Sequence, residues 1–433
     1  MAKILLFLVA FLHVFLAKAQ AESSEDPNSL KIWLTISAQN RSVEVSWVNA
    51  PANEGDQLLV TKQDAFSFQK KLQPHKGDQE LWEANGGAIE VVAAIQPSRG
   101  LSTEWITTQV PFDYNLSKNV TIATTCYGFW ASYIDAEGKI LAKSCLKAFP
   151  RWMNELRPKV ENLRLRDLFI PGSHFAGAYI PNFDLKRQTI MTKTRLAQDE
   201  EIKGQLMHGV RYLEVPLVYH RNLFDSYNND LFTMPLGTIL KEISNFVKET
   251  NEIVILGIKD FWCFHLRTCD DGEQKLARHL RDEFGDRIVD PSLTWNASLG
   301  DIWARKQNVL LTFDDPEMLK KFPELYFQSV EERSGNNRTW EIVETYFRDQ
   351  YAGLKNLKNA RPLADLAVLT ATEEDLWYGR VGLRELADDG NRRFSQLYRN
   401  ELGRSANIVS AEFIRGTTLA ETAIQFNTRK TKL

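Results

Sequence analysis

Several signatures of common enzyme classes are missing from this chain of 433 residues. It contains no glycine-rich phosphate loop, no GxSxG nucleophile elbow and no CxxC pair, so nothing indicates P-loop chemistry, an α/β-hydrolase or a zinc ribbon. Basic and acidic side chains number 53 and 56, and this balance argues against nucleic acid as the main partner. Beyond the amino terminus, no apolar run approaches the roughly 20 residues that a membrane-spanning helix needs.

The amino terminus has the layout of a secretory signal peptide. Residues 1–19 combine a lysine, an apolar run and a small-residue end, AKA. The apolar run is too short to cross a bilayer, which favours a signal peptide over the alternative of a signal anchor. We therefore expect a soluble protein that is secreted to the extracellular space. Residues 20–30 are expected to be a flexible segment and residues 429–433 a C-terminal tail.

Export bears on the four cysteines, because an oxidising compartment favours disulfides. Cys126 and Cys145 flank two strand-like runs, so a disulfide across a hairpin is expected, and Cys263 with Cys269 would close a small loop. Four cysteines allow three pairings, and the sequence leaves the other two open. Five glycosylation sequons fit an exported protein: Asn40, Asn115, Asn119, Asn296 and Asn337.

Residues 31–150 consist of short runs rich in β-branched and aromatic residues, among them SVEVSWV and YGFWASYI, separated by Asn, Gly, Pro and Asp. SVEVSWV alternates, which places Val43, Val45 and Trp47 on one face. Six or more such runs without a helical stretch predict an all-β sandwich domain. By fold analogy alone, we expect this domain to position or recognise a partner, and the partner itself cannot be deduced.

From residue 151 to residue 428 the pattern changes to alternating strands and helices. Strand-like runs such as EIVILGIKDF and NVLLTFDD are separated by amphipathic stretches such as LGTILKEISNFVKET. Alternation over this length predicts one α/β domain of the (β/α)-barrel type, with a doubly wound open sheet as the alternative. In either fold ligands bind at the carboxyl ends of the strands, where LFIPGSHFAGAY (168–179) places His174.

Five segments in a fixed order carry a family resemblance: IPGSHFAGAY, GVRYLEV, PLGTILKEISNFVKETNEIVILGIKDF, NVLLTFDDP and ANIVSAEFI. Together they resemble the X domain of the phosphatidylinositol-specific phospholipase C (PI-PLC) family, in its secreted, X-domain-only branch. The resemblance covers roughly the last three-fifths of the chain. It implies a distorted TIM-type (β/α)8 barrel and phosphoric diester hydrolase chemistry on an inositol phospholipid.

The resemblance also implies roles for single residues. In the family two histidines transfer protons, carboxylates orient them, and an arginine contacts the phosphate in metal-free members. His174 matches the histidine that acts as general base, Glu214 the acidic residue of the second strand, and Glu412 an aspartate that orients the base. Pro216 stands where the arginine is expected, and Phe175 replaces a polar neighbour of the base.

The second histidine is missing at its expected place, where Asn228 or Asn229 stands. An amide cannot deliver a proton, and each proton-transfer role contributes roughly 10²–10⁴-fold to the rate. We therefore expect weak or lost catalysis, that is, a pseudoenzyme that keeps a pocket for binding. The alternative is an active phosphodiesterase in which His220, on the same strand face as Glu214 by parity, is a displaced acid.

Lys259 and Asp260 end another predicted strand and are candidates for substrate contact, with a salt bridge or a snorkelling side chain as the alternative for the lysine. No cofactor is expected; calcium, held by Glu214, Asp260 and Glu412, is the minor alternative. For the aromatic segment 261–269, packing in the core under a rim loop is the favoured interpretation, and contact with a membrane surface is the alternative. The expected ligand is a phospholipid or inositol-phosphate headgroup.

Overall fold

The computed structural model describes residues 29–72, 80–97, 104–114, 120–264, 269–353 and 361–430. The predicted signal peptide, Asn115, Asn119 and most of the predicted C-terminal tail lie outside these ranges. Within the described ranges, no helix combines the length and apolar character that crossing a membrane requires.

Contacts divide the chain into two compact units, which differ from the predicted domains. The first unit comprises Met1–Trp33, Val45–Ile106 and Trp130–Ser144, and the second comprises Leu34–Glu44, Thr107–Phe129 and Cys145–Leu433. Short pieces of the N-terminal third therefore group with the C-terminal part rather than stopping at residue 150. The β-sandwich over residues 31–150 remains a prediction.

The described N-terminal residues form three sheets, β1-β2-β7, β6-β3-β8-β9 and β4-β5. Their strands are β1 (Lys31–Ile36), β2 (Ser42–Val48), β3 (Gln57–Thr61), β4 (Phe68–Leu72), β5 (Glu80–Ala84), β6 (Val91–Ile95), β7 (Glu104–Pro111), β8 (Cys126–Ile134) and β9 (Ile140–Lys147). The central strand β3 pairs antiparallel with both β6 and β8.

Strand β2 departs from the expected alternation. Its predicted inner face is buried, but Glu44 and Ser46 on the other face are also buried. The Glu44 carboxylate accepts hydrogen bonds from the Thr107 hydroxyl at 2.7 Å and from Arg392 Nε at 3.1 Å. An alternating pattern does not distinguish an exposed polar face from one that is covered and hydrogen-bonded.

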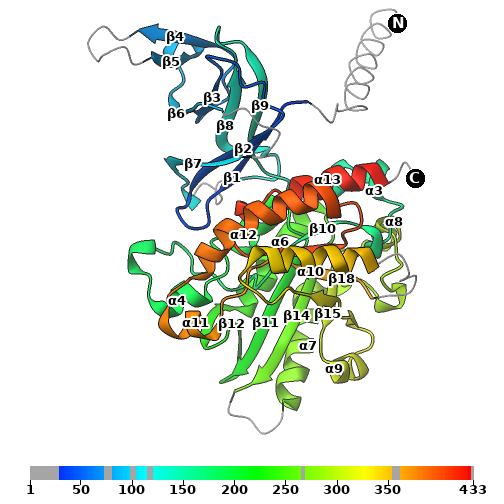
Figure 1. Ribbon diagram of the computed structural model, residues 1–433. Coiled ribbons are helices and arrows are strands. Elements are labelled where there is room, and N and C mark those ends of the chain that lie inside the picture. Colours follow the sequence, from blue (N-terminus) through cyan, green and yellow to red (C-terminus); the bar gives the residue numbers. More distant parts are fainter. Residues whose placement is uncertain are drawn as a thin grey trace, which may run out of the picture. The chain divides into compact units, whose positions relative to one another are not determined.

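The second unit contains a curled sheet with eight parallel strands in the order β16-β15-β14-β11-β10-β19-β18-β17 (Figure 1). They are β10 (Ile170–Ser173), β11 (Tyr212–His220), β14 (Val254–Cys263), β15 (Val309–Phe313), β16 (Phe327–Gln328), β17 (Glu331–Arg333), β18 (Leu363–Leu366) and β19 (Ile408–Ala411). Two more strands, β12 (Leu223–Asn228) and β13 (Leu231–Pro235), extend the sheet beside β11.

The spatial order repeats the chain order and returns from β19 to β10, as in a barrel. The ring is not closed by backbone pairing, because among the described strands no ladder joins β16 to β17. The fold is thus mixed α/β with a curled parallel sheet, consistent with the predicted TIM-type barrel.

The inner face of this sheet changes character along the strands. One buried core cluster contains residues from seven of these strands: Ile170, Tyr212, Ile255, Leu310, Phe327, Ala364 and Ile408. Only the inside of a curled sheet brings these residues together. Because successive strand residues alternate between faces, residues two or four positions further on lie above them on the same side. Those residues include His174, Glu214, Lys259, Asp314 and Glu412.

Helices connect the parallel strands, and α10 (yellow) and α12 (orange) are drawn in front of them in Figure 1. The helices are α2 (Trp152–Glu155), α3 (Arg157–Val160), α4 (Ile190–Arg195), α5 (Ile202–His208), α6 (Leu236–Thr250), α7 (Asp270–Phe284), α8 (Leu299–Ala304), α9 (Pro316–Lys321), α10 (Trp340–Gly353), α11 (Glu373–Tyr378), α12 (Leu383–Leu397) and α13 (Leu419–Lys430). The predicted helix LGTILKEISNFVKET coincides with α6, which ends at Asn251 in the left-handed conformation.

Candidate functional site

Three adjacent parallel strands bring the predicted site residues together at their carboxyl ends. Strand β10 lies between β11 and β19. His174 directly follows β10, Glu412 directly follows β19, and Glu214 is the third residue of β11. Neighbouring parallel strands end at one edge of the sheet, so residues distant in sequence meet there.

The His174 side chain lies between two glutamates and contacts both. Its Nδ1 lies 3.2 Å from Glu412 Oε1, and its Nε2 lies 3.5 Å from Glu214 Oε1. All three side chains are nearly buried, with His174 9% exposed. The structure therefore places the predicted base, strand-two carboxylate and orienting carboxylate in one cluster.

The carboxylates control the charge of the imidazole. Burial alone lowers the pKa of His174, but the charge of Glu214, the hydrogen bond to Glu412 and the charges of Glu412 and Glu332 outweigh burial and raise it to about 9. Burial also raises the pKa of the Glu214 carboxyl to about 7, although the charges of His174 and Lys259 oppose this shift. The two carboxylates thus favour the protonated form of the His174 imidazole, which cannot act as a base.

Two buried amides that the sequence analysis missed hold the backbone of this cluster. Gln198 Nε2 donates to the carbonyls of His174 and Ala411 at 2.9 and 3.0 Å, and Gln198 Oε1 accepts from the N–H of Ile414 at 3.2 Å. Asn391 Nδ2 donates to the carbonyls of Glu412 and the next residue at 3.0 and 3.2 Å. No sequence pattern signals either amide, because their partners are main-chain atoms of remote strands.

Lys259 lies on the same inner face but makes the salt bridge that the sequence analysis gave as its alternative role. Its ammonium pairs with Glu332 of β17, and in the sheet it stands beside Pro216. Asp260 is exposed, and its N–H donates to Asp314 Oδ2 at 3.0 Å. Glu332 and Asp314 were not among the predicted site residues; the run NVLLTFDD could have indicated Asp314 as a strand-end carboxylate.

His220 is not brought to His174. It lies six residues beyond Glu214 on β11, and at about 3.3 Å per residue this is a separation of roughly 20 Å along the strand. Its Nε2 lies 2.6 Å from Asp225 Oδ2 on the adjacent strand β12. The geometry does not favour His220 as the displaced proton donor.

The two asparagines at the expected place of the second histidine make structural hydrogen bonds. Asn228 is buried and its Nδ2 donates to the carbonyl of Arg195 at 2.8 Å. Asn229 Nδ2 donates to Asn228 Oδ1 at 3.0 Å. Asn228 is the last residue of β12 and Asn229 begins the turn to β13, and neither amide is acidic enough to donate a proton to a leaving group.

The other described histidines are His208 and His279. Burial and the charge of Arg415 lower the pKa of His208 to about 3. The ring of His279, on α7, packs edge-on against Phe224 with the centroids 5.4 Å apart. Neither interacts with the His174 cluster, and His265 lies outside the described residues.

Hydroxyl groups lie on the inner face below the cluster. Tyr212, Thr312 and Ser410 are buried, and their hydroxyls have no hydrogen-bond partner among the described residues, nor does Glu214 Oε2. In the described ranges, no three or more His, Cys, Asp or Glu side chains are arranged to hold a metal ion. Calcium remains the minor alternative proposed from the sequence.

Both predicted disulfides are present. Cys126 and Cys145 are bonded with their Cα atoms 5.8 Å apart, and Cys263 and Cys269 with theirs 5.6 Å apart. Of the sequons, Asn40 and Asn296 are exposed and Asn337 is half-buried. Glycosylation at these positions remains a prediction.

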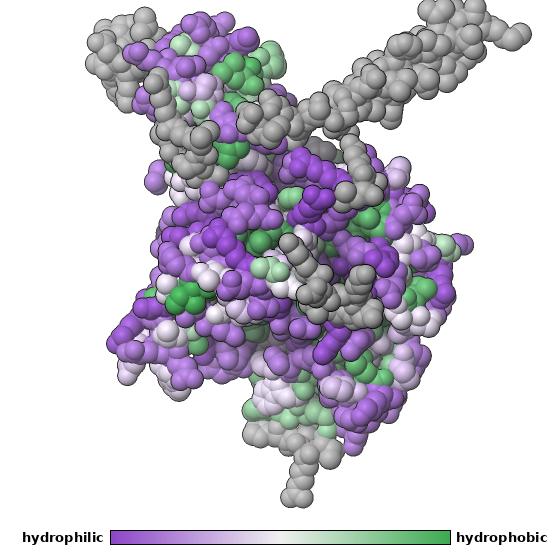
Figure 2. Space-filling model, turned by 45° about the vertical axis from the view of Figure 1, so that its right-hand side comes forward, coloured by the Kyte–Doolittle hydropathy of each residue, from purple (hydrophilic) through white to green (hydrophobic). Residues whose placement is uncertain are grey.

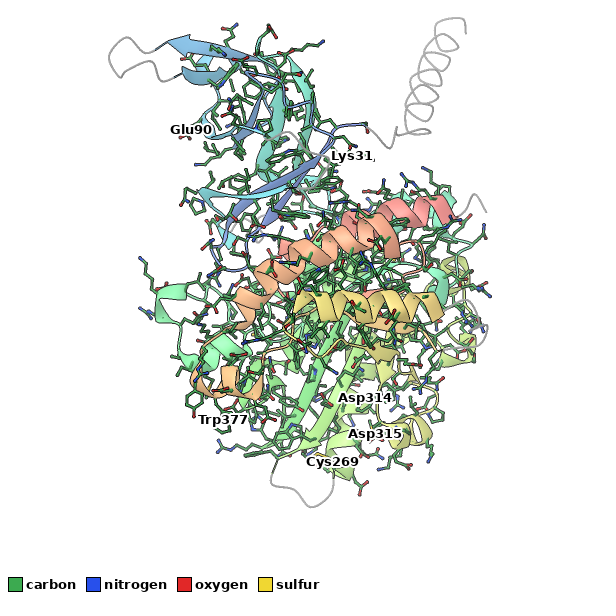
Figure 3. The ribbon with its side chains drawn as sticks, viewed as in Figure 1. Lys31, Glu90, Cys269, Asp314, Asp315 and Trp377 are labelled. Atoms are coloured by element: carbon green, nitrogen blue, oxygen red, sulfur yellow. A yellow bond between two sulfur atoms is a disulfide. The ribbon has the colours of Figure 1, made fainter. Side chains whose placement is uncertain are left out.

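An exposed apolar surface, here called the rim patch, lies on α4 and α11. It consists of Ile190, Met191, Trp377 and Tyr378, which are 56, 45, 80 and 66% exposed. These helices follow β10 and β18, so the patch belongs to the end of the sheet that carries His174. Figure 3 places Trp377 toward the same end of the unit as Cys269 and Asp314. Elsewhere the face in Figure 2 is largely hydrophilic, with small hydrophobic patches.

The parallel strand order and the buried histidine at the strand ends indicate a phospholipase C-type fold. A solved structure of phosphatidylinositol-specific phospholipase C from Staphylococcus aureus aligns with a TM-score of 0.50 and 12% identity, covering 64% of this chain and 96% of that chain. At this identity the likeness concerns the fold alone.

Sequence comparison supports the PI-PLC X-domain protein family, as the motifs indicated. The chain is 24% identical over 219 residues to human PI-PLC X domain-containing protein 1, covering 45% of this chain and 65% of that protein. It is 23% identical over 203 residues to a PI-PLC X-box domain-containing protein of Dictyostelium discoideum, covering 43% and 27%. The matches thus span between about a quarter and two-thirds of these relatives' lengths. No protein-family model matches the sequence.

Proposed function

We propose that this chain binds a phospholipid headgroup at a membrane surface and hydrolyses it slowly or not at all. One observation carries the proposal: two carboxylates hold His174, the candidate base, and raise its pKa to about 9. A general base must be unprotonated to accept a proton, and the two carboxylates beside His174 favour its protonated form.

The residues around His174 also lack the other parts of a metal-free phosphodiester cleavage. Pro216 stands where the resemblance places an arginine, and the nearby lysine is paired with a glutamate. Asn228 stands where a second histidine is expected, and its amide is bonded to the main chain. Losing an acid and a phosphate-facing cation together removes most of the rate enhancement that such a site can provide.

The rim patch supports a membrane surface as the place of binding. Trp377 and Tyr378 have an apolar ring body and a polar atom, the combination that lies at the membrane interface. Next to them, Ile190 and Met191 add aliphatic surface at the same end of the sheet as His174. A headgroup in the mouth and a lipid surface on the patch can therefore be bound simultaneously.

The same proposal includes the compartment in which the protein acts and the role of its N-terminal residues. The signal-like residues 1–19 and the two disulfides support secretion into an oxidising compartment. The exposed Asn40 and Asn296 are the sequons best placed for glycosylation. The β-rich residues 31–150 would form the sandwich that recognises a further partner.

The test uses the protein purified from culture medium. Co-sedimentation with phosphatidylinositol-containing vesicles measures binding, and release of water-soluble inositol phosphate measures hydrolysis. We expect binding with little or no release. Trp377→Ala should weaken binding several-fold, because it removes the most exposed aromatic ring of the patch. Phe66→Ala is the matched control, since Phe66 is 78% exposed in the first unit. Equal effects of the two substitutions would contradict a membrane role for the patch.

A second candidate function, active phosphodiester hydrolysis, is favoured by Glu214. A carboxyl group with a pKa of about 7 can donate a proton at neutral pH, and Glu214 lies 3.5 Å from His174 Nε2. Rapid release that both His174→Ala and Glu214→Gln abolish would establish this function and overturn the binding-only proposal.

A further inference from the structure

Carboxylates outnumber cations at the carboxyl end of the sheet. Among the described residues joined by the ion pairs and hydrogen bonds around His174 and Lys259, the carboxylates are Glu214, Asp260, Asp314, Glu332 and Glu412, and the cations are His174 and Lys259. Arg333 and Asp365 on β17 and β18 form a separate pair whose charges cancel. Glu332 is occupied by Lys259, and Glu412 by His174. In the part of the chain that is described, Asp260 and Asp314 make no ion pair, so the mouth carries an excess of negative charge that extends to the solvent.

Buried polar atoms that lack a protein partner are directed toward these carboxylates. The Tyr212 hydroxyl is fully buried and has no hydrogen-bond partner among the described residues. Burial raises its pKa most, and the negative charges of Glu214, Glu332 and Asp314 raise it further. A Cβ on Gly257 would meet this hydroxyl at 2.7 Å. Glycine at 257 therefore leaves room for the Tyr212 hydroxyl below the acidic mouth. A buried hydroxyl without a hydrogen-bond partner is costly, and a bound ligand would supply that partner.

Aromatic rings lie at the same strand end. The Tyr227 hydroxyl donates to the carbonyl of Asp260 at 2.8 Å, and its ring packs edge-on against Trp262 with the centroids 5.8 Å apart. The faces of such rings attract ammonium groups, and nearby carboxylates add to that attraction. The combination of acidic side chains and ring faces matches a positively charged ligand group.

We propose that the headgroup bound at this mouth carries an ammonium group, which Asp260 and Asp314 attract, and that inositol phosphodiester headgroups, which carry no cation, are bound less well. This inference rests on the proposed headgroup-binding function and specifies the ligand class. An inositol phosphodiester brings only negative charge to an end of the sheet that already has three more carboxylates than cations.

The test uses soluble headgroups, so that the rim patch does not contribute. Binding of glycerophosphocholine, glycerophosphoethanolamine and glycerophosphoinositol to the full chain is measured by calorimetry or tryptophan fluorescence. We expect the two ammonium probes to bind at least 10-fold more tightly than glycerophosphoinositol. The double variant Asp260→Asn/Asp314→Asn should remove most of this preference.

Asparagine suits both positions of that variant. Asp260 has a φ of 43°, a conformation that asparagine tolerates, and an asparagine at 314 retains an oxygen to accept the N–H of residue 260. Asp389→Asn is the matched control, because Asp389 is an exposed carboxylate on α12 that pairs with Arg393. The control should leave the preference unchanged.

Three outcomes would overturn the inference: equal or tighter binding of glycerophosphoinositol, binding that requires added calcium, or no binding of any soluble probe. None of them affects the vesicle experiment. If vesicles still bind through Trp377, the proposed function stands without this ligand class. If soluble ammonium probes bind but vesicles do not, the membrane role fails and the ligand class is retained.

Discussion

The two ends of the curled sheet both bury charged groups, but they treat them differently. At the amino ends of the strands, Arg211 and Glu252 form an ion pair with both side chains fully buried. Arg211 also donates to four main-chain carbonyls, and Glu252 accepts from the N–H groups of Met153 and Asn154. The hydrogen bonds of this ion pair are therefore made to other groups of the protein.

At the carboxyl ends the hydrogen bonding of the buried groups is incomplete. Glu214 Oε2 and the hydroxyls of Tyr212, Thr312 and Ser410 have no partner among the described residues. A buried charged group whose hydrogen bonds are all made within the protein stabilises one structure. A buried charged group next to polar atoms without hydrogen-bond partners can form hydrogen bonds with a ligand. Among the buried charged groups, Arg211 and Glu252 thus differ from Glu214 in how completely they are hydrogen-bonded, although all three are buried. The difference concerns these charged groups, because the amide oxygens of Asn308 and Asn407 at the amino end also lack a partner among the described residues.

The largest effect is expected at the amino end. Arg211→Met leaves Glu252 buried without a cation, and breaking a buried pair in this way costs about 3–5 kcal/mol of unfolding free energy. Arg305→Met is the control, because Arg305 and Asp290 are 47% and 43% exposed and such a pair contributes less than about 1 kcal/mol. Urea denaturation of the two variants measures the difference; similar costs would remove the contrast between the ends.

An intermediate effect is expected from Gln198→Leu at the carboxyl end. The leucine leaves the carbonyls of His174 and Ala411 without their partner, which costs about 1–3 kcal/mol, and it releases the loop that aligns the imidazole with Glu412. NMR titration should then show a lower pKa for His174. Gln205→Leu, which removes a similar pair of bonds to the carbonyls of Ala176 and Glu200, should cost similar stability but leave this pKa near 9.

The smallest effect is a change in pH dependence. The folded chain binds protons more tightly than the unfolded chain at two groups. The pKa of His174 is about 9 in the folded chain against an ordinary value of 6.5, and that of Glu214 is about 7 against 4.5. The stability from His174 is therefore complete below pH 6.5 and is lost as the pH rises through about 9; that from Glu214 is complete below pH 4.5 and is lost as the pH rises through about 7.

Glu214→Gln should reduce this loss, because it removes the carboxylate charge that raises the pKa of His174 most. We expect that pKa to fall by about one unit and the stability lost between pH 7 and pH 9 to shrink by roughly 1 kcal/mol. Glu317→Gln, at an exposed glutamate paired with Lys320, should leave the pH profile as it is. A steep profile that persists in Glu214→Gln would mean that other groups control the titration.

The sequence predicted the features that follow from local rules. Alternation of strands and helices indicated the curled parallel sheet, the strand-end rule indicated where His174 would lie, and the family resemblance indicated Glu214 and Glu412 as its partners. Cysteine spacing and export indicated the two disulfides. Each of these depends on residue types within a short segment or on a general property of parallel sheets.

The features that escaped prediction depend on distant backbone atoms. Strands β16 and β17 are too short for a period of two to be visible. Strand β18 ends at Leu366, and the apolar residues that follow it are buried outside regular structure, so a run of apolar residues does not mark where the strand ends. Gln198 acts on carbonyls of two remote strands, and no pattern in its own segment records those partners.

The open seam between β16 and β17 has a mechanical consequence. With no backbone ladder between those two described strands, the ion pair from Lys259 on β14 to Glu332 on β17 is a side-chain tie between the two sides of the break. Backbone ladders depend little on ionic strength, whereas an ion pair with a partly exposed carboxylate is weakened by added salt, to a smaller extent than a fully exposed pair. This side-chain tie is therefore the contact across the break that we expect to respond to the ionic strength of the solution.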